Sequence, residues 1–143
     1  MSMFHFIKGT DVASALDSVN RQYLVGDLTQ PQLLENICDS NVEMGITSYR
    51  EYACEAPHYH TETTTYEYIV DGYTKYYDVT NHHEYYFSKG DVVVIRPETV
   101  YAQKSLPGTV IVFFKHPSGN DKISVETSLE LESWLADWNN VLL

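Results

Sequence analysis

The sequence is poor in cysteine and in basic residues, and each shortage excludes a class of protein. Two cysteines, Cys38 and Cys54, are too few and too far apart for a disulfide framework, so we expect reduced thiols. Nine lysines and arginines stand against 20 aspartates and glutamates, which gives a net charge of −11. Such an acidic surface repels phosphate backbones and anionic lipids, which argues against nucleic acid and membrane surfaces as partners.

Long apolar runs are also missing. No stretch approaches the length of a membrane span, and residues 1–8 are too short for the apolar core of a signal peptide. We therefore expect a cytoplasmic protein. Its 143 residues, 43% of them hydrophobic, suffice for one domain that spans 1–143 and has its own core.

The residue pattern divides the chain into an N-terminal extension, a β-rich zone and a C-terminal helix. In the extension, residues 1–40, the pattern predicts one strand and then two short helices, at 3–7, 11–19 and 31–38. Thr29 and Pro31 would begin the second helix. From 42 to 122, short segments rich in Val, Ile, Tyr, Phe and Thr alternate with turns. Strands at this spacing favour an all-β sandwich or barrel over a βαβ fold.

Residues 128–140 are expected to form the C-terminal helix. Thr127 and Glu130 have the spacing of a capping box, which satisfies backbone donors at a helix start. Apolar residues then recur at helical spacing: Leu131, Trp134, Leu135 and Trp138. A helix this short is marginal alone, so it must dock on the barrel or on a second subunit.

A His-x-His pair, His58 and His60, is the most informative local feature. On an extended segment both imidazoles project from the same face, because side chains alternate with period two. Two imidazoles on one face are what a facial metal site takes from a single strand. Imidazole serves equally well as an acid–base group near neutral pH, so both interpretations stay open.

Two stretches resemble the two motifs of the cupin superfamily. Residues 57–72 resemble the first motif, in which His-x-His is followed by Gly72. Residues 90–101 resemble the second, in which a Gly-Asp turn leads through a buried strand and a proline turn to a final ligand. The resemblance covers roughly residues 42–115. It implies a double-stranded β-helix, or jelly-roll barrel, with a pocket built around His58, His60 and Tyr101.

The chain departs from these motifs at two of the four customary metal ligands. The family's glutamate falls at Thr65 and its final histidine falls at Tyr101, so metal ligation transfers only to the two histidines. Glu67 lies two residues after Thr65, on the same face and roughly 7 Å further along the strand. Glu62 is another candidate carboxylate, and the sequence leaves open which of the two faces the pocket.

Whether a single divalent or iron-type ion is bound therefore stays open, and no organic cofactor is expected. The candidate ligands are His58, His60, Glu67 and Tyr101. The family also implies a second use of the pocket, as a carbohydrate or nucleotide-sugar isomerase or epimerase that needs no metal. In that case His60 is the base and Tyr101 the acid. The candidate substrate contacts are His58, Thr65, Glu67, Arg96 and Tyr68.

Three functions remain in competition: this isomerase, a metal-dependent dioxygenase or lyase, and a non-catalytic binding or sensor protein. An anionic part of the substrate would be held by Arg96 or Lys104. The 12 tyrosines suit a polar organic ligand with apolar faces, such as a sugar. A jelly roll leaves sheet edges that need cover, so we expect a homodimer.

Overall fold

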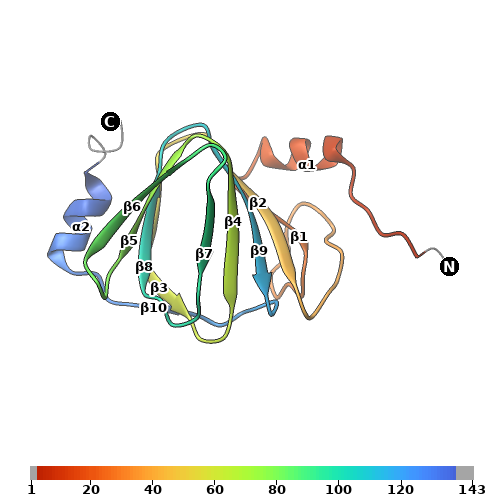
Figure 1. Ribbon diagram of the computed structural model, residues 1–143. Coiled ribbons are helices and arrows are strands. Elements are labelled where there is room, and N and C mark those ends of the chain that lie inside the picture. Colours follow the sequence, from red (N-terminus) through yellow and green to blue (C-terminus); the bar gives the residue numbers. More distant parts are fainter. Residues whose placement is uncertain (1–2, 138–143) are drawn as a thin grey trace.

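The computed structural model describes residues 3–137 and shows two five-stranded antiparallel sheets that face each other (Figure 1). Sheet A contains, in spatial order, β1 (Arg21–Val25), β2 (Glu43–Tyr49), β9 (Thr109–His116), β4 (Thr64–Asp71) and β7 (Val92–Ile95). Sheet B contains β10 (Lys122–Ser124), β3 (Ala53–His60), β8 (Tyr101–Ser105), β5 (Tyr73–Asp78) and β6 (His83–Ser88). The helices α1 (Gly9–Leu16) and α2 (Leu129–Ala136) lie on opposite sides of the barrel. The expected all-β jelly roll is confirmed.

The strands of sheet A direct polar side chains into the barrel. On β2, Thr47 and Tyr49 are buried while Met44 is exposed, and on β4 the buried Glu67 is followed by the exposed Tyr68. Side chains alternate between the two faces of a strand, so the register that buries Glu67 turns Tyr68 outward. An apolar cluster occupies only one part of the space between the sheets: Tyr76, Val93, Ile95 and Tyr101, with Phe87 packed against them. Elsewhere in the interior, buried polar side chains lie beside apolar ones such as Ile111 and Phe113.

Gly45 on β2 allows an aromatic ring to lie against the sheet. It pairs across the strands with Phe113 on β9, and a Cβ added at this glycine would lie 2.2 Å from the ring atom Cζ. We expect Gly45→Ala to lower the free energy of unfolding by about 1–3 kcal/mol in urea titrations, because the ring must move. Gly9→Ala in α1, where nothing lies within 4 Å, is the control and should not destabilise. Equal effects of the two substitutions would contradict this close packing.

The N-terminal segment differs from the sequence-based expectation. Residues 3–8 form no strand, α1 is shorter than the expected 11–19, and residues 31–38 form a loop in place of a helix. The loop is held by side-chain bonds to backbone: Gln32 bonds both the N–H and the carbonyl of Tyr23, and Gln22 accepts from the N–H of Leu34. Such bonds offer the backbone an alternative to a helix. The sequence did not predict β1, which pairs with β2 and adds an edge strand, beginning at Arg21, to sheet A.

The C-terminal helix α2 begins one residue later than the capping-box spacing suggested. Ser128, and not Thr127, is the N-cap, and its hydroxyl accepts from the N–H of Leu131. Lys104 anchors this helix, since its Nζ donates to the carbonyls of Trp134 and Asp137 at 2.8 and 2.6 Å. Lys104 is therefore not available to a substrate, which corrects its expected role. Trp138 and the last part of the expected helix lie outside the described residues.

No helix within residues 3–137 has the length and apolar character that a membrane crossing requires. Both cysteines are free thiols and exposed.

Candidate functional site

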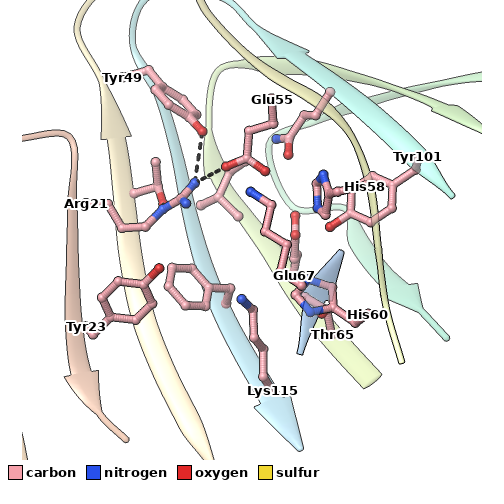
Figure 2. A pocket seen from close by; sticks show the side chains of 15 residues that line it. Arg21, Tyr23, Tyr49, Glu55, His58, His60, Thr65, Glu67, Tyr101 and Lys115 are labelled. Carbon is pink, nitrogen blue, oxygen red and sulfur yellow. Dashed lines mark hydrogen bonds and ion pairs between the residues drawn. The ribbon is translucent and has the colours of Figure 1, made fainter. Parts of the chain in front are cut away.

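A polar cavity of about 80 Å³ lies between the two sheets, and side chains from both sheets line it (Figure 2). Its wall includes five residues that the sequence singled out: His58, His60, Thr65, Glu67 and Tyr101. It also includes residues that the sequence did not single out, among them Arg21, Tyr49, Glu55 and Lys115. One part of the cavity wall thus consists of the motif residues, and the other consists of polar residues that come mainly from β1, β2 and β3.

His58 presents a neutral imidazole to the cavity. Its Nδ1 lies 2.8 Å from the carbonyl oxygen of Ala56, and a carbonyl can only accept, so Nδ1 carries the proton. The other ring nitrogen, Nε2, therefore holds a free lone pair. Burial lowers the pKa of His58 and keeps the ring uncharged at neutral pH. Its ring packs on Tyr101, its partner across β3 and β8, with centroids 4.5 Å apart.

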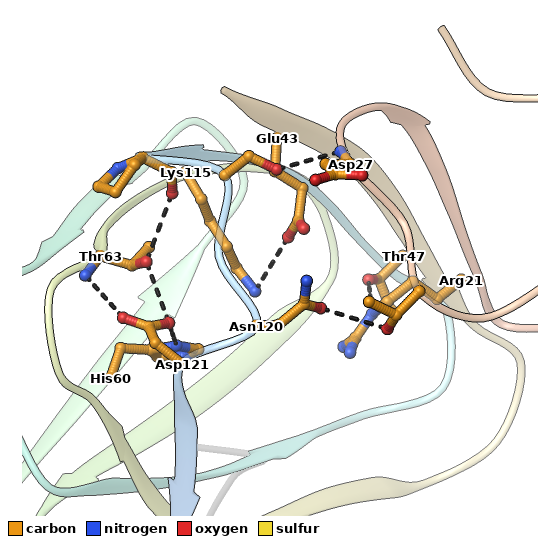
Figure 3. Close-up of polar contacts among 12 residues, drawn as sticks. Arg21, Asp27, Glu43, Thr47, His60, Thr63, Lys115, Asn120 and Asp121 are labelled. Atoms are coloured by element: carbon orange, nitrogen blue, oxygen red, sulfur yellow. Dashed lines mark hydrogen bonds and ion pairs between the residues drawn. The ribbon is translucent and has the colours of Figure 1, made fainter. Parts of the chain in front are cut away.

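His60 is held by a carboxylate. Asp121 Oδ1 lies 2.9 Å from His60 Nδ1 and also accepts from the Thr63 hydroxyl, while Oδ2 accepts from the backbone N–H groups of Glu62 and Thr63 (Figure 3). Burial raises the pKa of Asp121, but these hydrogen bonds lower it more, so it lies well below its usual range. An ionised carboxylate behind the ring fixes the tautomer and stabilises the imidazolium that forms when Nε2 takes a proton.

Glu67 is a carboxylic acid at neutral pH. Its side chain lines the cavity and is almost fully buried, and the hydroxyl of Tyr76 donates to its Oε2. Burial, and next the negative charge of Glu55, raise the pKa of Glu67 to about 8. The structure thus resolves which carboxylate faces the pocket: Glu67 does, whereas Glu62 is exposed and meets Asp121 only through its backbone N–H.

Tyr101 is a phenol that keeps its proton. It is buried on β8, beside His58 and stacked on Tyr76 with ring centroids 5.9 Å apart. Burial, followed by the nearby carboxyl of Glu67, raises the pKa of Tyr101 well above its ordinary value of 10. The hydroxyl therefore acts as a hydrogen-bond donor and not as a phenolate.

An ion pair between Arg21 and Glu55 faces these groups across the cavity (Figure 2). Arg21 Nη2 lies 2.5 Å from Glu55 Oε1 and 3.2 Å from the Tyr49 hydroxyl, and its Nε donates to Thr47 at 2.8 Å. Burial raises the pKa of Glu55, but the charge and hydrogen bond of Arg21 outweigh this effect and bring the pKa down to about 2. For Thr47 and Tyr49 the sequence held a signal, because alternation on one strand places both side chains on the same face.

Two expected substrate contacts lie elsewhere. Tyr68 is 50% exposed on the outer face of β4, because Glu67 takes the inward position beside it. Arg96 follows β7, is exposed and does not line the cavity. Thr65 does line it and is buried, as expected.

The donor set does not fit a metal centre. Within residues 3–137, no three His, Cys, Asp or Glu side chains gather in an arrangement that could hold a metal ion. His58 and His60 offer two imidazoles, but a threonine occupies position 65. The carboxyl group of Glu67 accepts a hydrogen bond from the Tyr76 hydroxyl. A facial metal site needs at least three ligands that converge on one point.

We accordingly expect protein purified without chelators or nickel resin to carry far less than one metal ion per chain. Its thermal midpoint should not change when a chelator is added, because no folding free energy depends on a metal. Elemental analysis and calorimetric melting test this expectation. One tightly bound ion per chain, together with a lower midpoint after chelation, would contradict it.

No family model matches the chain, and no curated protein matches it in sequence. Solved structures do match its fold. An uncharacterized conserved protein with a double-stranded β-helix domain from Klebsiella pneumoniae is 16% identical, with a TM-score of 0.55 over 66% of this chain and 81% of that one. The chain has the cupin fold. The resemblance read from the two sequence motifs is thereby confirmed at the level of the fold.

Two further cupin structures are similar to this one. The nucleoside dehydratase Pac13 of Streptomyces is 17% identical, with a TM-score of 0.54 over 64% of this chain and 74% of that one. Variants of that protein have been solved with uridine. KdgF from a Halomonas species is 19% identical, with a TM-score of 0.51 over 58% of this chain and 74% of that one. At these identities the likeness concerns the fold alone.

Proposed function

We propose that this cupin is an acid–base enzyme, an isomerase or epimerase of a carbohydrate or nucleotide-linked sugar. One observation carries the proposal: two imidazoles with protonated Nδ1 atoms line the same cavity as a neutral carboxylic acid and a phenol. Such a set offers bases and acids side by side at neutral pH. Perturbed titratable groups gathered in one cavity are what a catalytic site needs.

His60 is the base in this proposal. Its Nε2 removes the proton next to the substrate carbonyl, and Asp121 stabilises the resulting imidazolium through Nδ1. Asp121 is a positioning residue, since it acts through the histidine. His58 is held neutral by burial and accepts a hydrogen bond from a substrate hydroxyl.

Tyr101 and Glu67 are the acids. Proton removal next to a carbonyl places negative charge on the carbonyl oxygen, and a fixed donor in a buried cavity stabilises that charge. Tyr101 supplies such a donor. Glu67 has a pKa of about 8, near the working pH, which suits a group that gives a proton and takes it back. Return of the proton to a neighbouring carbon completes isomerisation, and its return to the opposite face completes epimerisation.

Dehydration is a second candidate, and the protonated state of Glu67 favours it. A hydroxyl group leaves as water only if an acid protonates it, and a carboxylic acid inside the cavity can do so. The first step, proton removal by His60, is common to both reactions. Pac13, which shares the fold, is a nucleoside dehydratase, and this supports testing nucleosides.

The common step can be tested before the substrate is known. The protein is incubated in D₂O with aldoses, ketoses, uronic acids, and nucleosides and nucleotide sugars whose sugar bears a keto or aldehyde group, and proton NMR follows exchange next to the carbonyl. Mass spectrometry then separates isomerisation, which leaves the mass unchanged apart from deuterium, from dehydration, which removes water. We expect exchange with at least one compound. Saturable binding without exchange across the panel would instead support a non-catalytic binding protein.

We also expect a homodimer. Apolar side chains that adjoin by strand pairing are partly exposed on the outer face of sheet A: Tyr66, Tyr68, Val92, Val94 and Phe114. An apolar patch this continuous is unusual on a monomer, and a second copy would cover it. Light scattering after size exclusion should give twice the chain mass, and Val92→Asp should give a monomer. Leu33→Asp, on the exposed loop, is the control, and a monomeric wild type would contradict this prediction.

A further inference from the structure

A second hollow of about 290 Å³ adjoins the cavity, and we refer to it as the vestibule. The two spaces share five lining residues: Arg21, Tyr23, His60, Lys115 and Lys122. The outer wall of the vestibule comes from residues 28–32, which precede β2, and from residues 119–120, which precede β10. A ligand part that does not fit in the small inner cavity can therefore extend into the vestibule.

Lys122 is the cation of the vestibule that has no fixed anion. It is exposed on β10, directly opposite His60 in the strand register. Its backbone pairs with β3, but its ammonium group makes no hydrogen bond or ion pair with a side chain in residues 3–137, and its charge helps to lower the pKa of Glu55. The other two cations are paired: Arg21 binds Glu55 at 2.5 Å, and Lys115 Nζ lies 3.3 Å from Glu43 Oε2 (Figure 3).

The neutral groups of the vestibule add donors. The Thr29 hydroxyl lies 3.5 Å from Asn120 Oδ1, to which it donates, and this leaves the two N–H groups of the Asn120 amide for a ligand (Figure 3). Tyr23 lines both hollows. The carboxylates nearby are engaged, Glu43 with Lys115 and Asp121 with His60 and Thr63. Positive charge and free donors thus gather at one mouth of a chain whose net charge is −11.

We propose that the vestibule binds an anionic group, a carboxylate or a phosphate, carried by the molecule whose reacting part enters the cavity. Lys122 is its principal contact and the Asn120 amide adds a donor. This inference rests on the proposed function and names the substrate class of the same site: a sugar or nucleoside that bears an acidic group. A lysine ammonium group is a compact charge with three donors, so it can bind such an anion when no other side chain holds it.

The test compares matched neutral and anionic probes. Titration calorimetry at low salt measures uridine against uridine 5′-monophosphate, and glucose against glucuronate and glucose 6-phosphate. We expect at least one anionic probe to bind about tenfold or more tightly than its neutral partner, the contribution of one hydrogen bond to a charged group. Glucuronate and glucose 6-phosphate distinguish a carboxylate from a phosphate. High salt should reduce the preference, because the vestibule is open to solvent.

Lys122→Met should remove most of that preference, because affinity for the anionic probe should fall much more than affinity for the neutral probe. Lys89→Met, in the exposed turn before β7, is the matched control and should keep the preference. Equal affinity for neutral and anionic probes, or an unchanged preference in Lys122→Met, overturns the vestibule proposal. The acid–base proposal survives that result if deuterium exchange is seen. If no probe of any pair binds and no compound exchanges, both proposals fail.

Discussion

His60→Gln is expected to slow deuterium exchange into the substrate by about 10²- to 10⁴-fold, the usual contribution of a positioned base. Glutamine keeps a polar side chain of similar reach but cannot take the proton. His83→Gln, an exposed histidine at the start of β6, should leave the rate unchanged. The rate is measured by proton NMR in D₂O on the compound that shows the fastest exchange with the wild type.

A second variant separates chemistry from structure. Asp121→Asn removes the charge behind His60 while keeping an oxygen for the backbone N–H groups of Glu62 and Thr63. We expect a smaller loss of rate than in His60→Gln, and a changed pH profile, because the imidazolium loses its carboxylate. A His60→Gln protein that is folded by circular dichroism and retains the wild-type rate would assign the base elsewhere, with His58 as the next candidate.

The sequence could predict the motif-bearing wall of the cavity because that information is local. A His-x-His pair on a strand must place both imidazoles on one face, and Thr65 and Glu67 share a face for the same reason. The same rule, applied one step further, turns Tyr68 outward, so that expected contact could have been rejected from the sequence. Arg96 lies at the end of a strand, where alternation alone does not decide its direction.

The opposite wall could not be predicted, because it depends on long-range pairing. Arg21 meets Glu55 only after β1 pairs with β2, an association between segments more than twenty residues apart. The loop between them is fixed by side chains: Gln32 on the backbone of Tyr23, and Gln22 on Leu34. Helix propensity in residues 31–38 is a weaker influence than these bonds, which exist only in the folded protein.

Glu67→Gln is expected to remove a large pH dependence of stability. The folded pKa of Glu67, about 8, lies above the ordinary value of 4.5, so between these values the folded state keeps a proton that the unfolded state releases. The stabilisation is complete below pH 4.5 and is lost as the pH rises through about 8. The total loss is on the order of 5 kcal/mol. Glutamine has no such titration and can still accept from the Tyr76 hydroxyl.

The measurement is urea unfolding of both proteins at matched pH values on either side of this window. His58 has the opposite sign: its pKa is lowered, so its contribution to stability increases as the pH rises toward 6.5. That contribution is common to both proteins and cancels in the difference between them. The wild type should lose stability relative to Glu67→Gln as the pH rises. A constant difference would mean that Glu67 is ionised throughout, and the cavity would then lack the carboxylic acid that favours dehydration and leave Tyr101 as its acid.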